Sequence, residues 1–148
     1  MEVKKILWPT DFSENSERAL PYVESLTEKY HTEIHLLYVV DDFAPNRPWY
    51  GDLQRANIDE LRKWEEKTAR ERLDKICTDY LKGCPRYVTH TASGDPAQEI
   101  LKFLKKEKVD MVVMAKHGEK GHFRLGSVSE RIVKNAPVPV VTVPTGSE

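Results

Sequence analysis

A short polar stretch near the end of the chain has the composition of an anion-binding turn. Gly126-Ser127-Val128-Ser129 follows a loop that holds Gly118 and Gly121, and it opens a pattern typical of a helix. Main-chain amides in the first turn of a helix attract phosphate through hydrogen bonds and the helix dipole. Glycine permits a close backbone approach, and a serine hydroxyl adds a hydrogen bond. The same residues also fit a loop followed by a helix cap, so both interpretations stay open.

Charged residues near this stretch and near the start of the chain extend the candidate site. Asp11 follows an apolar run that closes at Pro9, and its carboxylate fits a sugar hydroxyl, a metal-bound phosphate or the cap of the next helix. Lys116 and Arg124 flank the glycine-containing loop and would neutralise phosphate charge. The strict Gly-x-Gly-x-x-Gly and P-loop patterns are absent, so glycine spacing alone does not identify a nucleotide site.

Sequence motifs for metal binding and catalysis are absent. The five histidines show no ligand spacing, and two cysteines, Cys77 and Cys84, are too few for a zinc site or a disulfide framework. No nucleophile elbow and no serine–histidine–aspartate arrangement can be placed. We therefore expect no metal held by protein ligands and no catalytic residues.

Five short apolar runs alternate with four helical patterns, which predicts an α/β fold. Strands that alternate with helices pair in parallel through right-handed crossovers, so we expect a doubly wound sheet. The long second helix carries an apolar stripe that includes Trp64. This helix and the Trp49-Tyr50 loop would either cover the sheet or form a surface for a partner. The strands are predicted at Val3–Trp8, Ile34–Val40, Arg86–Ala92, Asp110–Ala115 and Val138–Val143, and the helices at Glu14–Tyr30, at Leu53–Leu81, from Pro96 onward and at Gly126–Ala136.

Prolines and capping residues predict where these elements begin and bend. Ser13 or Asp11 would cap the first helix, and Pro21 should bend it. Asp95-Pro96 fits the cap and first position of the third helix. Pro139 removes a ladder donor, so the last strand should lie at an edge of the sheet, where a partner subunit would cover it.

The order of the elements brings the candidate residues together. In a doubly wound sheet, ligands bind at the carboxyl ends of the strands where strand order reverses. We expect the first and fourth strands at the centre, so that their ends deliver Pro9-Thr10-Asp11 and Ala115-Lys116-His117-Gly118. The second strand ends in the same region at Val39-Val40-Asp41, and the last helix points its amino end there.

Length and composition predict one domain, residues 1–148, without the marks of a nucleic-acid or membrane protein. Hydrophobic residues make up 39% and charged residues 32% of the chain, a balance that supports a packed core. Lys plus Arg total 23 against 24 Asp plus Glu, so no basic surface for nucleic acid is indicated. There is no run of 18 apolar residues and no signal-peptide pattern. With so little cysteine, these features favour the cytoplasm.

Several segments together resemble the universal stress protein family, and the resemblance spans essentially the whole chain. The segment 6–13 resembles the family's first strand and turn, and 36–41 resembles its second strand. Gly94-Asp95-Pro96 resembles the third strand-to-helix turn, and the ending at 136–140 also matches. Met114-Ala115-Lys116-His117-Gly118, followed by Leu125-Gly126-Ser127-Val128-Ser129-Glu130, resembles the family's signature loop.

This resemblance implies an open sheet of five parallel strands in the order 3-2-1-4-5, with helices on both faces. It implies a stress-response protein that binds ATP or another adenine nucleotide, with or without Mg²⁺, and acts as a regulatory homodimer paired through Val138 to Val143. ATP hydrolysis would at most be slow, because no general base is evident. The nucleotide-binding residues implied are Pro9, Thr10, Asp11, Val39, Met114, Ala115, Gly118, Gly126, Ser127 and Val128.

Two departures from the family's pattern leave another function open. The ATP-binding branch has a Gly-x-x-Gly-x9-Gly-Ser/Thr loop, but Ala115 replaces its first glycine and only seven residues separate Gly118 from Gly126. A shorter loop alters the grip on phosphates, so the alternative is a dimeric scaffold of the same fold that binds no nucleotide. A phospho-acceptor receiver domain is disfavoured, because no lysine follows the last strand.

Overall fold

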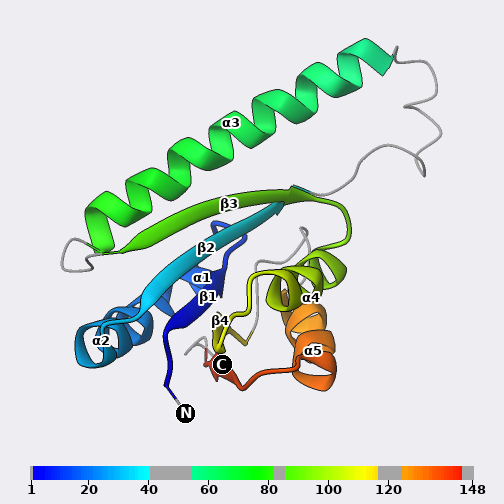
Figure 1. The fold of residues 1–148 in the computed structure, drawn as a ribbon. Coiled ribbons are helices and arrows are strands. Elements are labelled where there is room, and N and C mark those ends of the chain that lie inside the picture. The colour runs from blue at the N-terminus through cyan, green and yellow to red at the C-terminus, as the bar shows by residue number, and fades with distance from the viewer. Residues whose placement is uncertain (1, 41–54, 82–85, 117–124, 145–148) are drawn as a thin grey trace.

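The computed structural model describes residues 2–40, 55–81, 86–116 and 125–144, which form a parallel sheet covered by helices (Figure 1). Every pair of neighbouring strands in the sheet is parallel. The predicted α/β sheet with strand order 3-2-1-4-5 is therefore confirmed. The strands are β1 (Lys5–Pro9), β2 (Glu33–Val40), β3 (Tyr87–Ser93), β4 (Met111–Ala115) and β5 (Val140–Val143), in the order β3-β2-β1-β4-β5.

Helices pack on both faces of the sheet and create two separate hydrophobic cores. The helices are α1 (Glu14–Glu17), α2 (Leu20–Tyr30), α3 (Arg55–Tyr80), α4 (Pro96–Lys106) and α5 (Leu125–Asn135). Side chains of α2 and α3 fill the core on one face, and side chains of α4 and α5 fill the core on the other. Figure 1 shows α3 on one side of the sheet and the α4–α5 pair on the other.

The central strand β1 supplies side chains to both cores in alternation. Ile6 and Trp8 belong to the core under α2 and α3, whereas Leu7 belongs to the core under α4 and α5. All three side chains are 0% exposed. This pattern is typical of a parallel strand that is buried on both faces, and it explains why the run reads as continuously apolar.

The first helix departs from the prediction, because the chain forms two helices rather than one bent helix over Glu14–Tyr30. Arg18 and Ala19 separate α1 from α2, and Pro21 lies in the first turn of α2. Proline has no amide hydrogen, and its ring clashes with the carbonyl four residues earlier. The helix therefore stops and restarts, and Pro21 occupies a position where an amide partner is not needed.

The long helix α3 packs on the sheet through only part of its apolar stripe. Leu73 and Ile76 are buried in the first core, as is Cys77. Trp64 is 63% exposed, so the interpretation of this tryptophan as part of a packed stripe is wrong. Figure 1 shows the reason, since the helix is longer than the strands beneath it and extends past them. Among the described residues, no helix is both long and apolar enough to cross a membrane.

The predicted start of the third helix and the predicted edge strand are both confirmed. Asp95 is the N-cap of α4, where its carboxylate accepts a hydrogen bond of 3.0 Å from the amide of Gln98, and Pro96 begins the helix. β5 begins directly after Pro139 and lies at the edge of the sheet. The other strands match their predicted positions to within about two residues, which is the usual uncertainty of element ends.

Two adjacent residues of α5 offer a matched test of the second core. Ile132 is 0% exposed, whereas Val133 is 55% exposed. Replacing Ile132 with alanine should lower the free energy of unfolding by about 2–5 kcal/mol, because it leaves a cavity beneath the helix. Val133→Ala should change it by less than about 0.5 kcal/mol. Urea unfolding followed by circular dichroism measures both, and equal losses would contradict the packing described.

Candidate functional site

The carboxyl ends of β1, β2 and β4 meet at one edge of the sheet, as the sequence predicts. Pro9 pairs with Leu37, so Val39 lies further along β2 toward the same edge. Leu7 pairs with Val112, which places the end of β4 beside the end of β1. Strand order reverses between these two strands. The predicted site residues at this edge are Pro9, Thr10, Asp11, Val39, Met114 and Ala115.

Most of these residues have buried side chains. Thr10 is 2% exposed and Val39 is 3% exposed, while Met114 and Ala115 are both 0% exposed. A ligand at this edge would therefore meet main-chain groups and the half-buried side chain of Asp11. Recognition here would depend on the placement of the backbone more than on side-chain chemistry.

The turn after β1 is held by a compact set of hydrogen bonds. The Thr10 hydroxyl accepts from the amide of Phe12 at 2.9 Å and is hydrogen-bonded to the Ser16 hydroxyl at 2.8 Å. Asp11 Oδ1 accepts from the amide of Ser13 at 2.9 Å. Ser13 Oγ in turn accepts from the amide of Ser16 at 3.1 Å, so Ser13 is the N-cap of α1. Asp11 supports the capping residue and is not itself the cap, which decides between the two predicted candidates.

Phe12 adds backbone strain to this turn. Its φ angle is 65°, a left-handed conformation that is rare for a bulky residue. The ring stacks on Tyr38 of β2 with centroids 4.5 Å apart, and the guanidinium of Arg72 lies 4.3 Å from the ring centre. Strain of this kind persists where the surroundings determine the conformation, and it concentrates at functional turns. The sequence contains no signal for it, because the restraining contacts come from β2 and α3.

Burial also shifts one titratable group beside this turn. The carboxyl of Glu17 in α1 is partly buried, and this raises its pKa above the ordinary value. The nearby Arg72 acts in the opposite direction, and Glu14 adds to the increase. The net effect is that the pKa of Glu17 is higher than that of an exposed glutamate, because burial disfavours the charged carboxylate.

Helix α5 begins at Leu125, slightly before the predicted start at Gly126, and is tied to the end of β4. The Ser129 hydroxyl donates to the carbonyl of Lys116 at 2.9 Å, and the amide of Lys116 donates to the carbonyl of Val143 at 2.8 Å. Ser127 is exposed in the first turn, and Val128 is 6% exposed. Gly126 lies in that first turn, while Gly118 lies outside the described residues.

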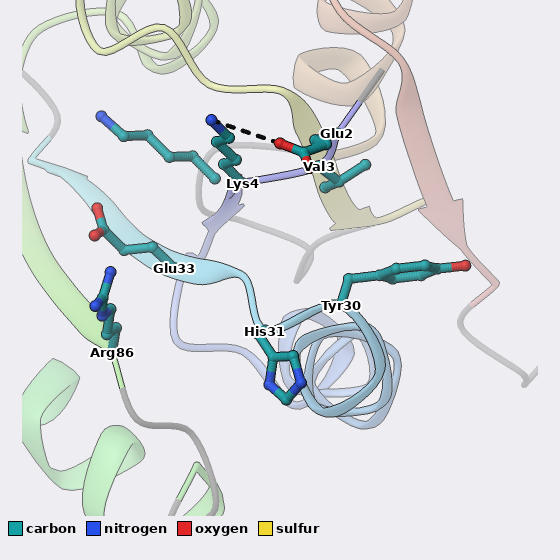
Figure 2. A pocket seen from close by; sticks show the side chains of 8 residues that line it. Glu2, Val3, Lys4, Tyr30, His31, Glu33 and Arg86 are labelled. Atoms are coloured by element: carbon teal, nitrogen blue, oxygen red, sulfur yellow. Dashed lines mark ion pairs between the residues drawn. The ribbon is translucent and has the colours of Figure 1, made fainter.

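A cavity that the sequence did not indicate lies at the opposite end of the sheet (Figure 2). Its volume is about 680 Å³, and it opens beside the amino ends of β1 and β2 and the end of α2. Lys4 and Glu2 form an exposed ion pair of 3.6 Å at its rim, and Arg86 and Glu33 also line it. Because acidic and basic side chains are mixed around it, the cavity favours no single ligand charge.

The fold is that of a doubly wound α/β protein whose strand order reverses between β1 and β4, the place where ligands of such folds commonly bind. A family model described as the universal stress protein family matches residues 2–144, and the chain belongs to this family. A universal stress protein of Methanocaldococcus jannaschii is 35% identical over 144 residues, which cover 95% of this chain and 81% of that protein.

Solved structures share the fold over nearly the whole chain. A second Methanocaldococcus jannaschii protein, also a universal stress protein, has a structure that is 27% identical, covers 100% of both chains and has a TM-score of 0.83. An Arabidopsis thaliana family member solved with AMP bound is 23% identical, with a TM-score of 0.58 over 95% of this chain and 90% of that one. An Archaeoglobus fulgidus member in complex with dAMP is 19% identical, with a TM-score of 0.63 over 96% and 98%.

Removing the Ser129 hydroxyl tests the link between α5 and β4. Ser129→Ala removes the donor to the part-buried Lys116 carbonyl, so the free energy of unfolding should fall by about 0.5–1.5 kcal/mol, the usual net contribution of one hydrogen bond. Ser25 is exposed on α2, and Ser25→Ala should change stability by less than about 0.5 kcal/mol. Chemical denaturation compares the two variants, and a neutral Ser129→Ala would show that the link contributes nothing.

Proposed function

We propose that this universal stress protein binds an adenine nucleotide, ATP or a close relative, at the carboxyl ends of its central strands. The observation that carries the proposal is the meeting of the Asp11 turn, the end of β4 and the amino end of α5 at the β1–β4 switch point. AMP and dAMP are the ligands of two family members with this fold, and a third was solved with cAMP. The shared adenine nucleotide class supports the same class here.

The nucleotide's parts can be assigned to parts of the site. The nucleoside would lie against Pro9, Thr10, Asp11 and Val39, where Asp11 is the polar side chain within reach of a sugar hydroxyl. The phosphates would lie over the first turn of α5, because amides there attract anions. The residues proposed to surround the phosphates are Gly126, Ser127 and Val128, together with Gly118, Met114 and Ala115.

A metal ion would enter with the phosphates. Within the described residues, no cluster of three histidine, cysteine, aspartate or glutamate side chains could hold a metal ion. Mg²⁺ commonly keeps several waters and takes phosphate oxygens as ligands beside one or two carboxylates. In this proposal Mg²⁺ would be carried by the nucleotide phosphates. The function that we propose for the protein is regulatory and cytoplasmic, and any hydrolysis of ATP would be slow.

The shortened loop supports a second function, a scaffold of the same fold that binds no nucleotide. Only seven residues separate Gly118 from Gly126, where the family's ATP-binding pattern has nine. The two functions differ in one measurable property, which is the affinity for nucleotides.

Calorimetric titration with ATP, ADP and AMP tests the leading proposal. Wild-type protein should release heat with at least one nucleotide at submillimolar concentration. Ser127→Ala should weaken binding by about threefold to tenfold, because one hydrogen bond to a phosphate oxygen is lost. Ser25→Ala should bind as the wild type does. An absence of heat up to millimolar nucleotide would contradict nucleotide binding and favour the scaffold.

We also propose that two copies pair through β5. Pro139 and Val143 use their carbonyls to accept from β4, so by strand alternation Val140 and Thr142 direct their main-chain groups toward the open edge. An exposed edge of this kind pairs readily with another strand. Antiparallel pairing with the same strand of a second copy would satisfy these groups symmetrically.

Proline at the outward position tests this interface. Thr142→Pro removes an amide that faces away from β4, so the sheet within one copy should survive while the dimer weakens. Light scattering after gel filtration should give about twice 17.1 kDa for the wild type and a mass near that of one chain for Thr142→Pro. Thr142→Val keeps the amide and should remain dimeric. A dimeric Thr142→Pro, or a monomeric wild type, would contradict the assignment.

A further inference from the structure

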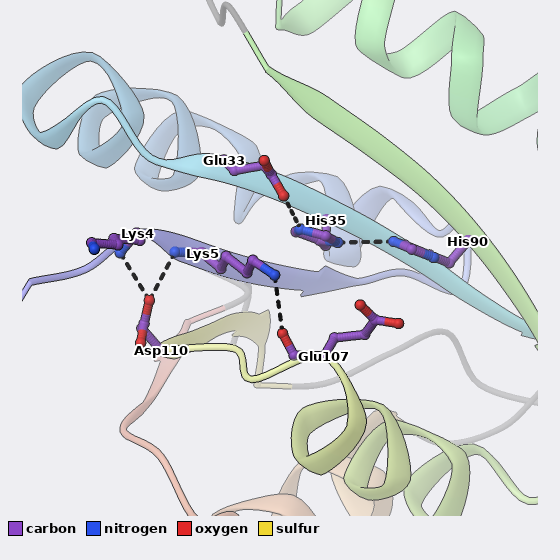
Figure 3. A network of polar contacts seen from close by, with 7 residues as sticks. All are labelled: Lys4, Lys5, Glu33, His35, His90, Glu107 and Asp110. Carbon is purple, nitrogen blue, oxygen red and sulfur yellow. Dashed lines mark hydrogen bonds and ion pairs between the residues drawn. The ribbon is translucent and has the colours of Figure 1, made fainter.

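A chain of three titratable side chains joins β2 to the edge strand β3 (Figure 3). Glu33 Oε1 lies 2.6 Å from Nε2 of His35, and Nδ1 of His35 lies 2.8 Å from Nε2 of His90. The planes of the two imidazole rings differ by only 11°. His35 is 4% exposed and pairs with Val88, whereas half-buried His90 lies in the middle of β3 and pairs with Leu37. None of these three titratable residues belongs to the site proposed for nucleotide.

The number of protons on the three side chains decides whether the hydrogen bonds between them persist. A carboxylate only accepts hydrogen bonds, so the contact with Glu33 requires a proton on Nε2 of His35. The bond between the two rings then needs one N–H group and one lone pair. Either His90 donates to a neutral His35, or a charged His35 donates to a neutral His90. If both rings are charged, two N–H groups face each other and the bond between the strands is lost.

The packing around the pair makes double protonation costly. The edge of the Phe103 ring meets both imidazoles, with centroids 4.7 Å from His90 and 6.0 Å from His35. Burial lowers the pKa of His90 below its ordinary value, and the neighbouring His35 lowers it further. Glu107 and Glu33 act in the opposite direction but do not outweigh these two effects.

Acidic and basic side chains of α4 lie beside His90. Glu99, Lys102, Lys106 and Glu107 line an open cavity of about 310 Å³ together with His90. Lys102 pairs with Glu99 at 3.3 Å, and Nζ of Lys5 donates to the Glu107 carbonyl at 3.2 Å.

Protons can reach the pair from this cavity. Every buried side-chain nitrogen or oxygen in the described part of the chain has a hydrogen-bond partner. His90 is half-buried and lines this open cavity, so solvent can reach its imidazole ring.

We propose that Glu33, His35 and His90 form a proton-operated latch that fastens edge strand β3 to β2 and α4 and opens when both imidazoles are charged. His90 favours its neutral form in the folded state, so the stability it contributes is complete above the ordinary histidine value of about 6.5. That contribution is lost as the pH falls from there through the lower pKa of folded His90. The latch therefore closes at neutral pH and opens in acid.

Hydrogen exchange of the β3 amides tests the latch. In the wild type, their protection should fall between about pH 7.5 and pH 5, by roughly tenfold for each unit that separates the folded and ordinary pKa of His90. His90→Gln places an amide that does not titrate near the position of Nε2, so its β3 protection should stay constant. His31 is exposed at the end of α2, and His31→Asn should keep the wild-type pH dependence.

Two results would overturn the proposal. One is constant β3 protection in the wild type over this range, and the other is a His90→Gln variant whose protection still falls as in the wild type. Histidine ring titration by NMR on the wild type gives a reading that does not depend on the variant's folding. The second proton of the His35–His90 pair should arrive together with the loss of β3 protection, and independent titration of the two rings would refute the latch.

Discussion

The central strand β1 is buried on both faces, because α2 and α3 pack on one face of the sheet while α4 and α5 pack on the other. Its side chains Ile6, Leu7 and Trp8 are 0% exposed. A strand enclosed in this way can meet a ligand only at its ends. At the carboxyl end, the chain must turn at once into α1. The indole of Trp8 donates to the carbonyl of Ser16 at 3.1 Å, so the buried strand and the Asp11 turn are fixed to each other.

Lys116 connects the two parts of the proposed function, which are nucleotide binding and dimer pairing. Lys116 has its amide bonded to Val143 of the edge strand and its carbonyl bonded to Ser129 of α5. One residue's main chain therefore lies between the helix start proposed for phosphate and the strand proposed for dimer pairing.

Local patterns in the sequence were sufficient for the architecture, because each element carries its own signal. Alternating apolar runs, the Asp95-Pro96 helix start and the proline before β5 each depend on neighbours in the chain. The break at Pro21 was predicted only as a bend, since the choice between bending and stopping depends on packing. Trp64 was misplaced for a similar reason, because a helical stripe does not show how far the sheet beneath it extends.

The location of the candidate site was predictable from the sequence, but the backbone conformation and the long-range contacts around it were not. Strand order and the carboxyl-end rule locate Pro9, Thr10, Val39 and the end of β4 at one edge. The left-handed Phe12 was invisible, because contacts from distant elements hold it there. The Glu33–His35–His90 chain was invisible as well, since 55 residues separate the two histidines and only the β2–β3 register brings them together.

The position of the Glu33–His35–His90 cluster also determines which part of the sheet would weaken if its hydrogen bonds broke. His35 shares one face of β2 with Leu37 and Val39, which belong to the core under α4 and α5. The face is thus polar toward the amino end and apolar toward the carboxyl end. Charging the imidazoles would weaken the amino-terminal half of the β2–β3 pairing first, because apolar burial does not titrate. His90 pairs with Leu37, and the strand continues beyond that pair to Val39, so the proposed nucleotide edge would keep the apolar support that Val39 receives from this core.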